Sequence, residues 1–90
     1  MRRAKVDRNQ VEVVKALRQC GFAVAHTHMV GRGFTDIVAA RRGHNYLIEI
    51  KDGAGQKLTP AQQKFHDEWP GIIRVVSSID DVLELARVLP

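Results

Sequence analysis

Apolar and polar residues follow two different periods along this 90-residue chain, and the changes of period mark the predicted elements. After Asn9, apolar residues recur at helical spacing until Gly21, which is typical of a helix end. The following segments alternate with a period of two or are rich in β-branched residues, as strands are. The predicted strands cover residues 22–27, 34–40, 46–51 and 72–76. The order helix, three strands, helix, strand, helix predicts a single α/β domain with a mixed sheet flanked by helices.

Side chains that can cap helices stand at the start of each predicted helix. In each case a Ser, Thr or Asn is followed three residues later by an acid or an amide, the form of a capping box or a related cap. The pairs are Asn9 with Glu12, Thr59 with Gln62, and Ser78 with Asp81. Pro60 occupies the first position of the second helix, where proline is well tolerated. The last helix is predicted to end near Val88.

The charge of the chain is concentrated in one part of it. Fourteen Lys and Arg against ten Asp and Glu give a net charge of +4, and residues 1–64 hold twelve of the bases and five of the acids. Such localised positive charge favours a polyanionic partner, although solvated basic turns would explain the same residues. The candidate contacts to a nucleic-acid backbone are Arg2, Arg3, Lys5, Arg8, Arg32, Arg41, Arg42, Lys57 and Lys64.

Cysteine usage and hydropathy bear on the class of protein. Cys20 is the single cysteine, so an internal disulfide framework and a cysteine zinc site are excluded, and we expect a reducing, cytoplasmic location. No apolar run approaches the roughly 18 to 20 residues that span a bilayer. We therefore expect an intracellular protein without a membrane partner or a small-molecule cofactor.

Charged residues on the second and third predicted strands form the candidate chemistry. Alternation puts Glu49 and Lys51 on one face of their strand, and a hairpin about residues 41–45 would bring Asp36 across from them. Two close carboxylates repel each other unless a proton or a metal lies between them. Oxygen ligands suit Mg²⁺ or Mn²⁺, and a neighbouring lysine can orient water or offset phosphate charge. The alternative is that these are outward charges of a half-exposed sheet.

Two segments together resemble a known nuclease superfamily. The residues 33–38, Gly-Phe-Thr-Asp-Ile-Val, followed by residues 47–51, Leu-Ile-Glu-Ile-Lys, resemble the PD-(D/E)XK nucleases. Glu12, the short loop after Lys51, and residues 57–62 make the chain most similar to the virus-type replication-repair nuclease (VRR-NUC) family, with Holliday junction resolvases as neighbours. The resemblance implies a restriction-endonuclease-like αβββαβ core plus a C-terminal helix. It also implies Mg²⁺-dependent (or Mn²⁺-dependent) hydrolysis of DNA phosphodiesters.

The resemblance implies a role for each matching residue. Asp36, Glu49 and the carbonyl of Ile50 would be metal ligands, Glu12 an additional ligand, Lys51 the catalytic amine, and Gln62 a polar residue facing the site. Glu12 and Gln62 also have a simpler interpretation as capping residues. The sequence departs from the family at Thr35, where proline is usual, and we expect a looser turn before Asp36.

The sequence leaves rival functions and the assembly state open. The rivals are a catalytically inactive nucleic-acid-binding module with a nuclease-like fold, and an enzyme acting on RNA or another phosphate ester. We expect a homodimer, because apolar residues persist in the last third of the chain: Trp69, Val82, Leu85 and Leu89. The alternative is that the last helix packs them against its own sheet. His26 and His28 are predicted to point outward from the first strand, as phosphate contacts or as ordinary surface histidines.

Overall fold

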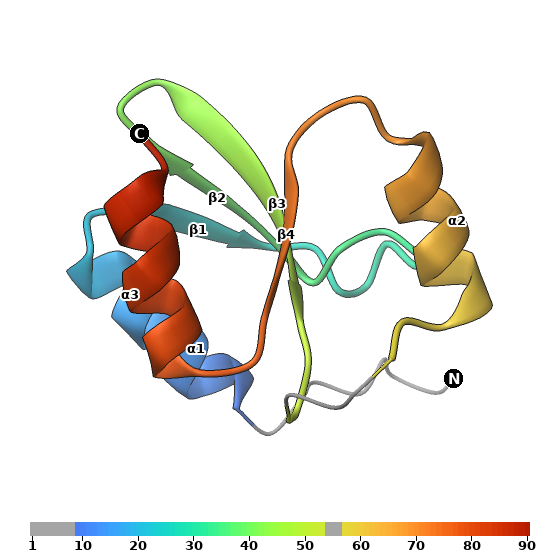
Figure 1. The fold of residues 1–90 in the computed structure, drawn as a ribbon, viewed down its shortest axis with the longest axis horizontal. Helices are drawn as coiled ribbons and strands as arrows, with labels where there is room; N and C mark the ends of the chain where they lie inside the picture. Colours follow the sequence, from blue (N-terminus) through green and yellow to red (C-terminus); the bar gives the residue numbers. More distant parts are fainter. Residues whose placement is uncertain (1–8, 54–56) are drawn as a thin grey trace.

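The computed structural model describes residues 9–53 and 57–90 as three helices and one four-stranded sheet (Figure 1). The elements are α1 (Gln10–Gln19), β1 (Ala23–His26), β2 (Ile37–Arg41), β3 (His44–Ile50), α2 (Pro60–Glu68), β4 (Ile73–Val76) and α3 (Ile79–Val88). The strands lie in the order β1-β2-β3-β4; β1, β2 and β3 are antiparallel neighbours, and β4 is parallel to β3. The predicted α/β order and mixed sheet are confirmed, although β2 begins three residues later than predicted.

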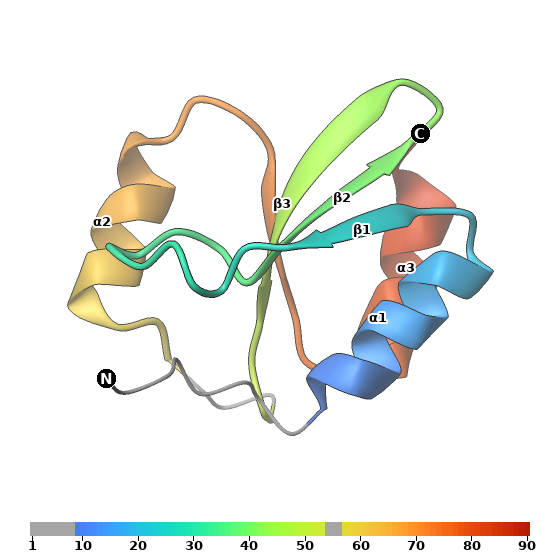
Figure 2. The ribbon, with the colours of Figure 1, turned by 180° about the vertical axis from the view of Figure 1, so that it is seen from behind.

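The helices lie on opposite sides of the sheet. In Figures 1 and 2, α1 and α3 cover one face while α2 lies on the other side. Tyr46, Ile48 and Ile50 project toward α1 and α3 and are buried in the core. This face of β3 forms the apolar core with α1 and α3. Glu49 projects from the opposite face of β3, the face on which α2 lies. In the described part of the chain, no helix has the length and apolar character needed to cross a membrane.

The start of α1 differs from the predicted capping box. Asn9 stands at the N-cap but makes no side-chain capping bond there. Its side-chain amide Nδ2 instead donates to the carbonyl oxygens of Lys51, at 3.0 Å, and Ser77, at 2.8 Å. Asn9 therefore ties the start of α1 to the ends of β3 and β4, next to the candidate site. The capping box of Thr59 with Gln62 and the cap of Ser78 on the Asp81 amide are both present, as predicted.

Arg41, a predicted phosphate contact, makes structural contacts within the domain. Its guanidinium lies 4.2 Å from the ring centroid of Phe22. It donates hydrogen bonds to four backbone carbonyl oxygens, those of Cys20, Ala86, Leu89 and Pro90. These carbonyls lie in or just after the last turns of α1 and α3, where a cation is stabilised by the helix dipoles. The sequence does not predict these bonds, because backbone acceptors from distant segments leave no trace in the local sequence.

The hairpin between β2 and β3 places two predicted DNA contacts far from the candidate site. Arg41 pairs with His44, so Arg42 and Gly43 form a two-residue turn, and both have positive φ angles (54° and 82°). Asp36 precedes the other end of β2. With about 3.3 Å per strand residue, five residues separate the two ends by roughly 16 Å. The expectation that Arg41 and Arg42 surround the site is therefore wrong.

Candidate active site

Asp36 and Glu49 are brought together by the register of β2 and β3. Ile37 lies opposite Ile48, so continuing the antiparallel register by one residue places Asp36 opposite Glu49. The Leu47 amide donates to the carbonyl of Ile72, just before β4, and the Lys51 amide donates to that of Val76 in β4. Odd-numbered residues along β3 therefore direct their N–H groups away from β2. Asp36 and Glu49 therefore form a non-hydrogen-bonded pair, the kind whose side chains lie closest, with Cβ atoms about 4.5 to 5.5 Å apart. Both carboxylates share one face of the sheet, as the sequence predicts.

The carboxylate of Asp36, the residue just before β2, accepts a backbone hydrogen bond from the end of β3. Its Oδ2 atom accepts a hydrogen bond of 2.7 Å from the Ile50 amide. In an antiparallel pair, the N–H and C=O of one residue point to the same side of the strand. The Ile50 carbonyl is therefore directed to the side of β3 on which Asp36 lies. This gives three oxygen groups at one place: two carboxylates and one backbone carbonyl.

Glu49 is a buried acid under α2. Only 1% of the residue is exposed, and its Oε2 atom accepts a hydrogen bond of 3.1 Å from the Gln62 side-chain amide. The Nε2 atom of His66, one helical turn after Gln62, lies 3.9 Å from the Oε1 atom of Glu49. Burial of the imidazole, followed by the positive charge of Lys51, lowers the pKa of His66 below its ordinary value. His66 therefore favours its neutral form beside this carboxylate.

Gln62 joins the acid to the amine. Its Oε1 atom accepts a hydrogen bond of 2.7 Å from the Lys51 Nζ atom and one of 2.9 Å from the Thr59 amide. The backbone amide of Gln62 donates in turn to the Thr59 hydroxyl, at 3.2 Å. The capping role and the site role proposed for Gln62 are thus not alternatives, because one side chain performs both. The N-terminal turn of α2 fixes the position of the Lys51 amine relative to Glu49.

The loop before β2 holds α2 in place. Phe34 packs edge-on against Phe65, with ring centroids 5.3 Å apart, and Phe65 stacks on Trp69 at 5.2 Å. Gly33 has a φ of +81°, and a Cβ atom there would lie 2.3 Å from the Ala61 carbonyl oxygen. Only glycine permits this approach between the loop and the first turn of α2. Phe65 thus packs against both the loop and Trp69.

Thr35 stabilises the segment that leads to Asp36. The residue is fully buried, and its hydroxyl donates to the Ile37 carbonyl at 3.2 Å. Its own carbonyl accepts a hydrogen bond of 2.8 Å from the Thr27 hydroxyl, and the Thr27 amide donates to the Asp36 carbonyl at 2.8 Å. These contacts hold the turn where a proline would otherwise restrict it. The hydrogen bonds therefore indicate a well-held turn before Asp36, where a looser one was expected.

Comparison with known proteins identifies the fold. No protein-family model matches the sequence, and no curated protein matches it. A solved structure described as a "VRR_NUC domain" superimposes with a TM-score of 0.78 at 24% sequence identity. The match covers 92% of this chain and 95% of that one. This chain has the fold of a VRR_NUC domain. The VRR_NUC fold agrees with the αβββαβ core and C-terminal helix that the sequence resemblance implies.

Within this VRR_NUC fold, Glu12 is not brought to Asp36 and Glu49. It is exposed on α1 and lines a hollow that also includes Ile79 of α3, on the core side of the sheet. In residues 9–53 and 57–90, no three or more His, Cys, Asp or Glu side chains form a group that could hold a metal. Asp36 and Glu49 are the two carboxylates that the strand register brings together, and the role of Glu12 as an additional ligand stays a prediction.

The predicted DNA contacts are spread over the molecule. Arg32 is exposed, with a φ of 57°, in the loop that leads to Asp36, and Lys57 is exposed just before α2. Both flank the candidate site in the chain. Arg42 lies exposed at the distant hairpin turn. Arg2, Arg3, Lys5 and Arg8 lie outside the described residues.

The donor set of the candidate site suits a hard divalent cation. Mg²⁺ prefers oxygen ligands, keeps several waters, and is commonly held by only one or two carboxylates. Asp36, Glu49 and the Ile50 carbonyl offer oxygen atoms only, at the end of one strand pair. A cation would also relieve the repulsion between the two carboxylates. The residues present therefore fit Mg²⁺ or Mn²⁺.

His66 is the site residue that the sequence interpretation missed. The sequence predicts no role for His66, because a single histidine on a polar helix does not by itself indicate a functional site. Its spacing from Gln62 was the available clue, since residues four apart lie on the same helical face. Once Gln62 faces Glu49, His66 must face it as well.

Proposed function

We propose that this domain is a metal-dependent nuclease that hydrolyses phosphodiester bonds in DNA. The observation that carries the proposal is the pairing of Asp36 with Glu49 and the link from Glu49 through Gln62 to the Lys51 amine. Its VRR_NUC fold supports the same class of reaction. We further propose structure selectivity, with branched substrates such as junctions or flaps preferred.

Each site residue has a distinct part in the proposed reaction. The carboxylates of Asp36 and Glu49 and the carbonyl of Ile50 would hold Mg²⁺, or Mn²⁺ in its place. When bound, the ion would supply Lewis acidity at the phosphate and would lower the pKa of a bound water. The Lys51 ammonium orients the attacking water and offsets the negative charge that develops on the phosphate. Gln62 keeps that ammonium beside Glu49, because it is hydrogen-bonded to both.

The main rival is a nucleic-acid-binding module without catalysis. Binding alone is poorly served by two adjacent carboxylates, because they repel the phosphate backbone unless a cation lies between them. A buried Glu49 is also costly for a protein that gains nothing from it. The same geometry would serve hydrolysis of RNA, so RNA belongs among the test substrates.

The test compares cleavage by variants that keep the shape of each side chain. Asp36→Asn, Glu49→Gln and Lys51→Gln are incubated with labelled junction, flap, duplex and single-stranded DNA and with RNA, in Mg²⁺, Mn²⁺ or EDTA. We expect each variant to lose at least ~100-fold in rate, the scale typical of removing one electrostatic group from a site. Glu68→Gln, which changes an exposed acid on α2, is the matched control and should cleave normally. Cleavage that continues in EDTA, or in purified Asp36→Asn, would refute the proposal.

We propose further that the working form is a homodimer joined along β4. Val82 and Leu85 are buried in the chain's own core, as the monomer alternative supposes, so these two residues are not available for a dimer interface. Trp69, Ile72 and Val75, however, are exposed by 42%, 43% and 46%, and β4 is an edge strand. Exposed apolar edges of this kind invite pairing. Light scattering with size exclusion at micromolar protein tests this, and a monomer mass in the presence and absence of junction DNA would contradict it.

A further inference from the structure

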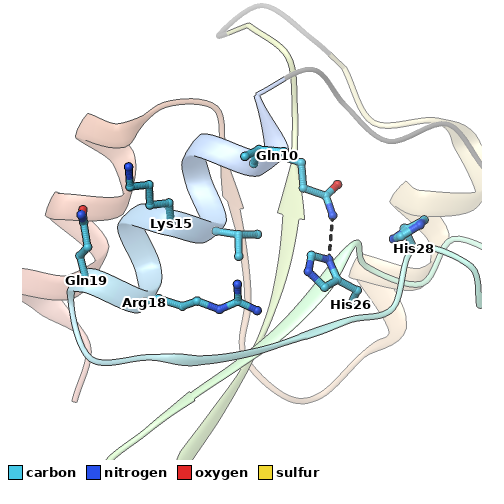
Figure 3. Close-up of a pocket in the computed structure, with 8 residues that line it drawn as sticks. Gln10, Lys15, Arg18, Gln19, His26 and His28 are labelled. Atoms are coloured by element: carbon cyan, nitrogen blue, oxygen red, sulfur yellow. Dashed lines mark hydrogen bonds between the residues drawn. The ribbon is translucent and has the colours of Figure 1, made fainter.

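A groove runs between α1 and β1, outside the cluster of Asp36, Glu49 and Lys51. Its volume is about 730 Å³, and eight residues line it (Figure 3). Val11 and Val14 provide its apolar surface, and 74% of Val11 is exposed although it is a large apolar residue. Lys15 and Arg18 lie on the same wall of the groove, four residues after Val11 and Val14, respectively. The groove thus combines apolar surface with a pair of cations.

The charge of the groove has one sign. Lys15 and Arg18 are the charged residues among the eight that line it, and none of the eight is an acid. His26 and His28 form the opposite wall, with ring centroids 6.2 Å apart and planes at 82°. Aromatic rings of this kind can stack against bases that are not paired. The lining therefore suits an anion that carries flat apolar groups.

A buried polar group at one end of the groove has spare hydrogen-bonding capacity. Gln10 is 2% exposed, and its Nε2 atom lies 3.2 Å from the His26 Nδ1 atom, as Figure 3 shows. Its Oε1 atom and the Nδ1 atom of His28 have no hydrogen-bond partner among residues 9–53 and 57–90. Buried polar atoms are normally satisfied, so these two point to a ligand with donors and acceptors of its own.

The groove opens at the end of the sheet where the candidate active site lies. Gln10 follows Asn9, which is hydrogen-bonded to the Lys51 carbonyl. On the other wall, Thr27 lies between His26 and His28, and its amide is hydrogen-bonded to the Asp36 carbonyl. One end of the groove is therefore close in the chain to residues that contact the backbone of Asp36 and Lys51.

We propose that the groove between α1 and β1 binds an unpaired nucleic-acid strand, an inference that rests on the proposed nuclease function. Lys15 and Arg18 contact its phosphates, the histidines and Val11 contact its bases, and Gln10 hydrogen-bonds to a base edge. An unpaired strand is the fitting occupant because a duplex hides its base faces and would leave the apolar surface uncovered. The groove would favour substrates in which an unpaired segment adjoins the cleaved bond.

The test measures binding without cleavage. Fluorescence anisotropy in EDTA follows a labelled twelve-nucleotide thymidine strand and a labelled hairpin duplex. The double variant Lys15→Gln/Arg18→Gln should bind the strand at least ~10-fold more weakly. The slope of log affinity against log salt concentration should become less steep by about 1.4, because each of the two lost phosphate contacts contributes roughly 0.7 for a single strand. Arg42→Gln/Arg87→Gln removes the same charge from exposed positions outside the groove and away from β4, and should change binding by ~2-fold at most.

A second measurement tests the base contacts separately. A strand with abasic sugars keeps its phosphates but offers no bases, so the unaltered protein should bind it at least ~5-fold more weakly than the thymidine strand. Val11→Asn should reduce this preference. Equal loss of strand binding in the two double variants would overturn the proposal. Equal affinity for the abasic strand, or duplex affinity as high as strand affinity, would overturn it as well.

These outcomes are separate from those of the cleavage assay. If strand binding depends on the groove but no DNA is cleaved, the nuclease proposal fails while the strand site stands. If DNA is cleaved but the two double variants bind alike, only the groove proposal fails.

Discussion

Replacement of Gly33 by alanine should release α2 from the rest of the domain while the sheet stays folded. The new Cβ atom would lie 2.3 Å from the Ala61 carbonyl oxygen, a backbone atom that cannot swing aside. Gly31→Ala is the matched control, because Gly31 has a similar φ (+77° against +81°) and open space around its Cβ position. The two variants therefore share the backbone strain and differ in the steric contact with α2.

The expected magnitudes follow from these two terms. Alanine in the left-handed region costs about 1 to 2 kcal/mol, and this applies to both variants. Overpacking against the Ala61 carbonyl adds roughly 1 to 3 kcal/mol for Gly33→Ala alone. Helix α2 has no buried residue, so moving it away costs less than unfolding a domain whose total stability is about 5 to 13 kcal/mol. The steric term should therefore appear as local opening of α2.

Amide hydrogen exchange distinguishes local from global effects. In Gly33→Ala, the amides of α2 should exchange about 5- to 140-fold faster than in Gly31→Ala, from 1 to 3 kcal/mol at 1.4 kcal/mol per tenfold. The amides of β3 should exchange alike in the two variants. Cleavage should fall in Gly33→Ala only, because Gln62 leaves Glu49 and Lys51 with the helix. Equal exchange of α2 in the two variants would refute the idea that this contact holds the helix.

Three further predictions concern other parts of the structure. Arg41→Gln should lower the free energy of unfolding by about 2 to 4 kcal/mol in urea titrations, since it removes charge-assisted bonds to four carbonyls and the contact with Phe22; Arg42→Gln should stay within ~0.5 kcal/mol. Thr59→Ala should cost about 1 kcal/mol through the lost cap, and protection of α2 unchanged by it would contradict the capping role. His66 has a lowered pKa in the folded state, so the unfolded state binds its proton first. Metal-free stability should therefore fall as the pH drops below 6.5 toward that lower pKa, and His66→Gln should flatten this part of the pH profile. An unchanged profile in that variant would assign the pH dependence to other groups.

Several features of the fold were determined by the sequence alone because their causes are local. The caps at Thr59 and Ser78 involve atoms three residues apart, and both helices begin where the sequence predicts. The alternation of β3 fixes Glu49 and Lys51 on the face opposite the core. A short hairpin at residues 41–45 suffices to set the register, and the register places Asp36 opposite Glu49. The pair of candidate ligands could therefore be predicted from spacing and pleat.

Only the tertiary structure decided which residues serve the site and which hold the molecule together. Asn9 bonds to carbonyls 42 and 68 residues away, and Arg41 bonds to the carbonyls of Cys20 and Leu89, which follow α1 and α3. Gln62 and His66 meet Glu49 only because α2 docks on the loop at Gly33. Such contacts are made to backbone atoms or across distant segments. Every residue carries the same backbone atoms, so the sequence around them holds no signal of which partner will arrive when the chain folds.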